Sequence, residues 1–198
     1  MNRREAVAGV ASVGVLGTGV AVLQRGLPFG DDGPAEETAD DGDDSGIDPL
    51  AVDVLEDERG DAAATDTLSV PNDGVTLAMI FSPVCSRCRA LLPELAAARE
   101  ELRADYGDAL TVLSATSQGM PDQLRDWWAE NDGQWVLGYD PDRRLGDRYD
   151  VVGHPTLLAI DGAGTLQWDN RGQLEAEQIV GNVEPVLEAH AGANGETQ

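Results

Sequence analysis

A seven-residue apolar run that leads into a cysteine pair constrains this chain more than any other stretch. Residues 75–81 read VTLAMIF, and the sequence SPVCSRC follows directly. An uninterrupted apolar run of this length, with β-branched members and a turn at its end, is typical of a buried strand. From Cys85 onward, apolar residues recur at helical spacing, which predicts a helix whose buried side holds Leu91, Leu92, Leu95, Ala98 and Leu102. Cys85 and Cys88 are therefore expected where a central strand gives way to a helix.

The expected position of Cys85 favours a thiolate. At the N-cap of a helix, a sulfur faces unpaired backbone N–H groups and the positive end of the helix dipole, and both stabilise negative charge. Cys88 follows about one helical turn later, close enough to form a short disulfide with Cys85. We interpret the pair as a redox site.

Two other roles for the pair stay open on the residues alone. Cys85 and Cys88 are the only cysteines, and they could form a structural disulfide, although so small a loop constrains the unfolded chain little. They could also bind zinc, which takes about four ligands in a structural site. Only His154 and His190 are left to complete such a site, and neither has finger-like spacing, so we expect no metal.

The charge of the chain is extreme. It carries 37 acidic residues against 13 basic ones, all of them arginine, for a formal net charge of −24. This balance excludes a generic nucleic-acid-binding surface, because the phosphate backbone would be repelled. Strong acidity without lysine resembles proteins from salt-saturated environments, where screening removes the self-repulsion. We attribute the acidity to salt adaptation, which says nothing about the reaction.

The first 49 residues are expected to precede the folded domain. Arg3 and Arg4 stand before an uncharged stretch at 6–23, so residues 1–27 are interpreted as an export signal or an N-terminal membrane anchor. The paired arginines resemble the start of a twin-arginine signal. The positive-inside rule then places the rest of the chain outside the cell. Residues 28–49 contain nine acids and are interpreted as a disordered tether, because they cannot bury enough apolar area to offset their ordering entropy.

The remaining chain alternates strands and helices. A helix at 140–149 is expected to open with Pro141 at its first position. Residues 161–164, DGAG, predict the turn of a hairpin. One further helix is expected to begin near Cys85, and two more to cover 121–130 and 174–190. The expected strands are at 50–54, 67–70, 75–81, 110–115, 135–139, 157–160 and 165–168.

This order strongly resembles the thioredoxin fold, and within it the extracytoplasmic TlpA/ResA-like branch, over about residues 50–191. The resemblance rests on the CxxC at the first strand–helix junction, on Pro155 ahead of the penultimate strand and on Pro93 past the second cysteine. It implies an α/β fold in which helices flank a central mixed sheet, with an N-terminal extension, an inserted βα unit and a disordered tail at 192–198. Pro155 corresponds to the family's cis-proline, and Pro93 to its helix-kinking proline.

The resemblance also implies a thiol-disulfide oxidoreductase that acts on protein thiols and disulfides. Cys85 would attack the partner, and Cys88 would resolve the mixed disulfide. His154 and Pro155 would bind the partner chain, with Arg87 and Pro93 in supporting positions. No dissociable cofactor is expected, because the redox centre is the cysteine pair itself. We expect a monomer that is held at the membrane through its N-terminal segment.

The chain departs from the family pattern at several positions. Val84 replaces the usual aromatic residue before the first cysteine, and the motif encloses Ser86 and Arg87. Leu91 and Met79 stand where the family places acids, so the usual proton acceptor for Cys88 is missing.

We expect His154, next to Pro155, to face Cys85 and to stabilise its thiolate or carry its proton. Two alternatives remain for the function of the whole domain. One is a non-catalytic thioredoxin-like binding or chaperone module with a structural disulfide, and the other is a thiol handler in cytochrome c maturation or metal delivery.

Overall fold

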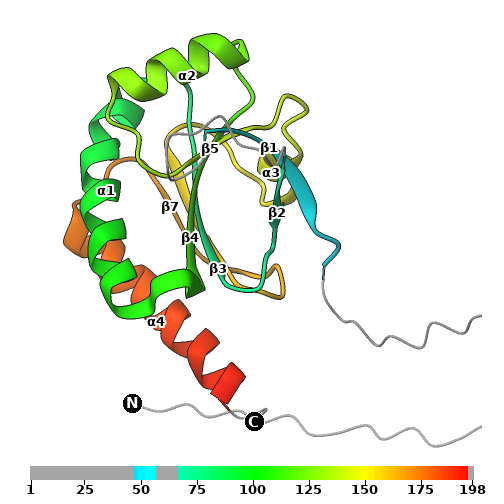
Figure 1. Cartoon of the computed structure of the whole chain (residues 1–198), viewed down its shortest axis with the longest axis vertical. Coiled ribbons are helices and arrows are strands. Elements are labelled where there is room, and N and C mark those ends of the chain that lie inside the picture. Colours follow the sequence, from blue (N-terminus) through cyan, green and yellow to red (C-terminus); the bar gives the residue numbers. More distant parts are fainter. Residues whose placement is uncertain (1–46, 57–66, 196–198) are drawn as a thin grey trace, which may run out of the picture. The chain divides into compact units, whose positions relative to one another are not determined.

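A computed structural model describes residues 47–56 and 67–195 of the chain (Figure 1). The predicted signal or anchor, most of the predicted tether and residues 57–66 lie outside the described residues. The division into a leader, a tether, a domain at 50–191 and a tail therefore stays a prediction. Within the described ranges, none of the helices combines the length and the apolar character that crossing a membrane requires.

The centre of the fold is β3 (Val75–Ile80), whose six residues are all buried. It pairs in parallel with β4 (Leu110–Thr116) and antiparallel with β6 (Thr156–Ile160). A strand that has neighbours on both edges and packed layers on both faces must be apolar throughout, which explains the uninterrupted VTLAMIF run.

The other strands extend this sheet on both sides. β5 (Val136–Tyr139) pairs in parallel with β4, and β1 (Leu50–Glu56) follows it antiparallel. β2 (Thr67–Val70) forms one edge and β7 (Leu166–Arg171) the other, in the order β2-β1-β5-β4-β3-β6-β7. The predicted mixed sheet and the hairpin around residues 161–164 are both confirmed.

Helices cover both faces of the sheet (Figure 1). The long helices α1 (Ser86–Tyr106) and α4 (Ala176–Gly195) pack together on one face, where α2 (Pro121–Glu130) also contributes to the core. A short 3-10 helix, η1 (Gly107–Ala109), leads from α1 into β4. The second face carries α3 (Arg144–Arg148) and a smaller apolar core.

Alternation along β1 lets this strand serve both cores. Leu50, Val52 and Val54 point toward the core beside α3, and Leu55, the next residue, points into the core on the other face. The pairing of β1 with β5 shifts its register between Val54 and Glu56, where β1 carries one extra residue.

The start of α3 corrects the sequence prediction. The helix begins at Arg144, so the expectation that it opens with Pro141 is wrong. The carboxylate of Asp140 accepts hydrogen bonds from the backbone N–H groups of Arg144 at 3.0 Å and Leu145 at 2.8 Å. Its carbonyl accepts the N–H of Arg143, whose φ of 58° is left-handed. Asp140 thus closes a turn that contains Pro141, and its carboxylate caps α3 although Asp140 itself precedes the helix by four residues.

The final helix also differs from its predicted bounds. It begins at Ala176 rather than at residue 174, and it continues to Gly195, past the expected end of the domain at 191. Its apolar residues Ile179, Val180, Val183 and Leu187 are buried against the core.

The capping role of Asp140 can be measured. Asp140→Ala should lower the free energy of unfolding by about 1–2 kcal/mol, because two backbone N–H groups lose their acceptor. Urea denaturation, followed by circular dichroism, checks this. Asp142→Ala is the matched control: Asp142 is exposed in the same turn, so its effect should stay within about 0.5 kcal/mol. Equal effects of the two substitutions would contradict the capping role.

Candidate active site

Cys85 sits at the N-cap of α1, as the sequence predicts. The turn after β3 is closed by a hydrogen bond from the Cys85 N–H to the Ser82 carbonyl at 3.0 Å. Cys85 has an extended backbone, with φ −86° and ψ 112°, and its sulfur accepts the N–H of Cys88 at 3.2 Å. The side chain is half-buried, so the sulfur is capped by the helix and still open to a partner.

Cys88 lies in the first turn of α1 and is fully buried. Burial, together with the hydrogen bond to Cys85, raises the pKa of its thiol to about 12, although the Ser82 backbone and Arg87 act in the opposite direction. Cys88 is therefore a protonated thiol at neutral pH.

The surroundings of Cys88 are apolar where the family has acids. Met79 and Leu91 are fully buried members of the same core cluster as Cys88. Among the described residues, no carboxylate contributes to the shifted pKa of Cys88. Nothing in this cluster offers the negative charge that would accept a proton from the thiol.

The loop ahead of β6 meets the cysteine pair through its backbone. The peptide bond between His154 and Pro155 is cis, as the resemblance implies. The carbonyl oxygen of His154 accepts a hydrogen bond from the Cys85 sulfur at 3.8 Å and another from Nη2 of Arg87 at 3.5 Å. The carbonyl of Pro155 accepts the N–H of Gly172 at 2.9 Å. The fold thus brings Cys85, Arg87 and the cis-proline loop together.

The imidazole of His154 is placed differently from its carbonyl. Its Nδ1 atom is buried and has no hydrogen-bond partner in the described part of the chain. His154 also lines a small cavity of about 20 Å³ together with Thr116 and Asp140. The contact with Cys85 comes from the His154 backbone, and a role for the ring in stabilising the thiolate stays a prediction.

Pro93 lies inside α1 on its exposed side, well past the sulfur atoms along the helix. A proline in a helix interior removes one backbone hydrogen bond and favours a kink. A role for Pro93 in shaping the helix that presents Cys85 stays a prediction.

Two exposed valines are close in sequence to residues of the site, and the sequence analysis did not single them out. Val84, directly before Cys85, is 86 % exposed, and Val152, in the loop ahead of His154, is 68 % exposed. Apolar side chains this exposed can contact an apolar partner. The replacement of the family's aromatic residue by Val84 was the signal in the sequence.

A polar pair beside the turn was also missed. Ser82 is buried, and its hydroxyl donates to the side-chain oxygen of Gln118 at 2.8 Å. Gln118 follows β4, the parallel neighbour of β3, so both residues leave the sheet at the same edge. That shared edge is what could have identified the pair from the sequence.

No group of three or more His, Cys, Asp or Glu side chains that could hold a metal ion occurs in residues 47–56 and 67–195.

Comparison with known proteins adds relatives of low sequence identity. No family model matches the chain. The thiol:disulfide interchange protein HelX of Rhodobacter capsulatus is 25% identical over 134 residues, which cover 67% of this chain and 72% of that protein.

Solved structures share the fold. StoA from Bacillus subtilis matches with a TM-score of 0.55 and 16% identity, over 67% of this chain and 94% of that one. A secreted thiol-disulfide isomerase from Corynebacterium glutamicum matches with a TM-score of 0.60 and 17% identity, over 71% and 84%.

The two thiols should differ in their reactivity. Iodoacetamide at neutral pH should modify Cys85 first, because thiolates are the reactive form and Cys88 keeps its proton until the pH approaches its pKa of about 12. Peptide mapping after limited labelling of the reduced protein checks this, and unfolding in urea is the control, since it should make the two cysteines react alike. Preferential labelling of Cys88 in the folded protein would reverse the assignment.

Proposed function

We propose that this thioredoxin-like protein is a thiol:disulfide oxidoreductase that exchanges its Cys85–Cys88 pair with protein partners. The resemblance predicted from the sequence is confirmed by the shared fold and by the similarity to HelX. One observation carries the proposal: a half-buried sulfur caps a helix, and a second thiol lies buried one turn behind it.

The reaction that this arrangement supports is a two-step exchange. The thiolate of Cys85 attacks one sulfur of a partner disulfide, forms a mixed disulfide and releases the other partner sulfur as a thiolate, which takes up a proton. Cys88 then gives up its proton and attacks the Cys85 sulfur, which releases the second partner thiol. Two electrons have passed from the pair to the partner. The same steps in reverse oxidise a partner dithiol.

The residues around the pair would hold the partner chain. The backbone at His154 and Pro155 would align an extended segment of the partner, in the manner of strand addition. The exposed side chains of Val84, next to Cys85, and of Val152, two residues before His154, support this, since each offers apolar area to a partner. Arg87, which lies beside the His154 carbonyl, would add positive potential near the sulfur.

We further propose that the protein works outside the cytoplasm, attached to the membrane by its N-terminal segment. The uncharged stretch after Arg3 and Arg4 supports export, and the isomerase from Corynebacterium glutamicum is described as secreted. In this proposal the acidic residues at 28–49 form the tether, and the domain works as a monomer on protein thiols and disulfides.

A non-catalytic module is the second candidate. The buried apolar residues Met79 and Leu91 favour it, because no carboxylate of the described residues acts on the Cys88 thiol. The reduction potential of the Cys85–Cys88 pair distinguishes an oxidoreductase from a non-catalytic module. Catalysts of this type span about −270 to −120 mV, whereas structural disulfides lie below about −300 mV. Equilibration of the purified protein with glutathione or dithiothreitol buffers measures it.

A trapping experiment tests the proposed exchange directly. The full-length Cys88→Ser variant should accumulate mixed disulfides with its partners, because the second attack cannot occur and Cys85 stays bonded. Non-reducing gels of cell extracts should show these adducts, and reductant should dissolve them.

The matched control is the double variant Cys85→Ser, Cys88→Ser, which should form no adduct. Adducts of equal amount in the single variant Cys85→Ser would mean that Cys88 is the attacking residue. A Cys88→Ser variant that is folded by circular dichroism and forms no adducts would favour the non-catalytic module.

The export route gives a separate prediction. Replacing Arg3 and Arg4 by lysine should block export through the twin-arginine route while preserving the positive charge. Protease protection in intact cells, with immunodetection of the domain, locates the protein. Export that continues at the wild-type level would point to the general secretory route.

A further inference from the structure

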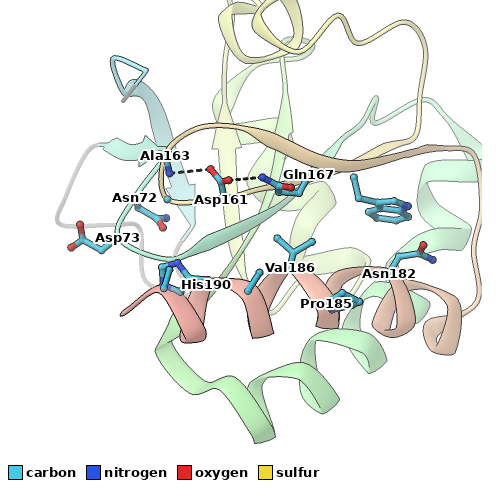
Figure 2. A pocket seen from close by; sticks show the side chains of 13 residues that line it. Asn72, Asp73, Asp161, Ala163, Gln167, Asn182, Pro185, Val186 and His190 are labelled. Atoms are coloured by element: carbon cyan, nitrogen blue, oxygen red, sulfur yellow. Dashed lines mark hydrogen bonds between the residues drawn. The ribbon is translucent and has the colours of Figure 1, made fainter. Parts of the chain in front are cut away.

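A cavity of about 750 Å³ lies at the end of the sheet opposite the cysteine pair (Figure 2). The C-terminal half of α4, β7 and the turn ahead of β3 enclose it. Asn72 and Asp73 of that turn precede β3, whereas Cys85 follows its other end, so about 20 Å of strand separates the cavity from the sulfur atoms. The volume lies within the range of small-molecule sites.

A β-bulge shapes one wall of the cavity. Ile160 pairs with Leu166 and Ala159 pairs with Trp168, which leaves Gln167 as an extra residue in β7. Because of this extra residue, Leu166 packs on the core beside α3 while Trp168 turns to the opposite core, beside α4. Gln167 and Trp168 both line the cavity.

The cavity has an apolar wall that faces its polar side. Pro185 and Val186 of α4 point into it, across from Gln167 of β7 (Figure 2). Trp168 is half-buried, so part of its ring stays accessible to a ligand. A ligand with an aliphatic or flat body would find surface to bury there.

The amide N–H groups of Asn72, Gln167 and Asn182 in the lining donate hydrogen bonds to other residues of the protein. The Asn72 amide donates to Thr76 and Thr111, both at 3.2 Å. The Gln167 amide donates to Asp161 at 2.6 Å, and the Asn182 amide donates to the Gln178 carbonyl at 2.6 Å.

The amide oxygens of Gln167 and Asn182 accept no hydrogen bond from residues 47–56 and 67–195. These two oxygens are therefore available to accept hydrogen bonds from a ligand.

The charged residues of the lining also favour a ligand that donates hydrogen bonds and carries positive charge. It contains the carboxylates of Asp73 and Asp161 and the imidazole of His190, but no arginine. Asp161 is engaged by the N–H groups of Ala163 and Thr165 and by Gln167, so it closes the hairpin as well as contributing charge. Asp73 is exposed and forms no ion pair among the described residues. A cation is therefore favoured over an anion in this cavity.

We propose that the cavity binds a guanidinium or primary ammonium group carried on a short apolar chain. The cation would donate to the amide oxygens of Gln167 and Asn182, and the apolar chain would lie against Trp168, Pro185 and Val186. Asp73 lies at the other end of the cavity, where it adds negative potential (Figure 2). Free alkylamines and the arginine or lysine side chains of a peptide share this chemistry. The site does not depend on the proposed redox function, since it uses none of the residues around Cys85.

Isothermal titration calorimetry on the full-length protein tests the proposal with two probes. One is agmatine, and the other is a blocked tripeptide with a central arginine, compared with the same tripeptide carrying glutamine. Binding of agmatine alone supports a free amine as ligand, binding of the arginine peptide alone supports a protein side chain, and binding of both supports the shared chemistry. Failure of both probes to bind overturns the proposal.

Two substitutions with opposite expected effects locate the binding. Asn182→Asp should lower the dissociation constant about three- to fivefold, and Asp73→Asn should raise it by a smaller factor, because Asp73 lies at the other end of the cavity. Asp169→Asn is the matched control, because Asp169 is exposed on the same strand as Trp168 but does not line the cavity. An equal loss of affinity in Asp169→Asn would show non-specific attraction to an acidic protein and overturn the proposal, as would unchanged affinity in the other two variants.

Discussion

The complete burial of β3 is the constraint on which the structure depends. A strand with six buried residues needs neighbours on both edges and a packed layer on each face. The chain supplies both edge neighbours, β4 and β6, from segments that follow β3 in the sequence. The strand therefore ends at the rim of the sheet, and the chain must turn out of the core there. The turn after Ser82 and the start of α1 at Cys85 follow from that exit.

The same burial makes the two thiols unequal. Cys85 caps the helix at the rim, where it is half-buried, whereas Cys88 reaches back into the cluster that holds Met79 and Leu91. Desolvation keeps the inner thiol protonated, so the order of reaction is built into the depth of each sulfur. The chain achieves this asymmetry with apolar residues where the family it resembles has acids.

Much of this could be predicted from the sequence, because the relevant signals are local. Unbroken apolarity at 75–81, helical spacing after Cys85 and the DGAG turn each depend on a few neighbouring residues. The features that the sequence did not reveal depend on competition between groups. The start of α3 is set by the Asp140 carboxylate, and the face of Trp168 by an extra residue in β7. The approach of the His154 backbone to Cys85 depends on how two distant loops pack.

The sulfur of Cys85 belongs to two structures at once, since it is half of the redox pair and also the acceptor for the first turn of α1. A sulfur bonded in a disulfide cannot become the thiolate that the N-terminus of a helix stabilises, so the end of the helix is better satisfied in the reduced state. Electron uptake and the stability of α1 are thus one linked equilibrium. Any change along α1 that stabilises its first turn more in one oxidation state than in the other shifts the electron affinity of the protein, without touching either cysteine.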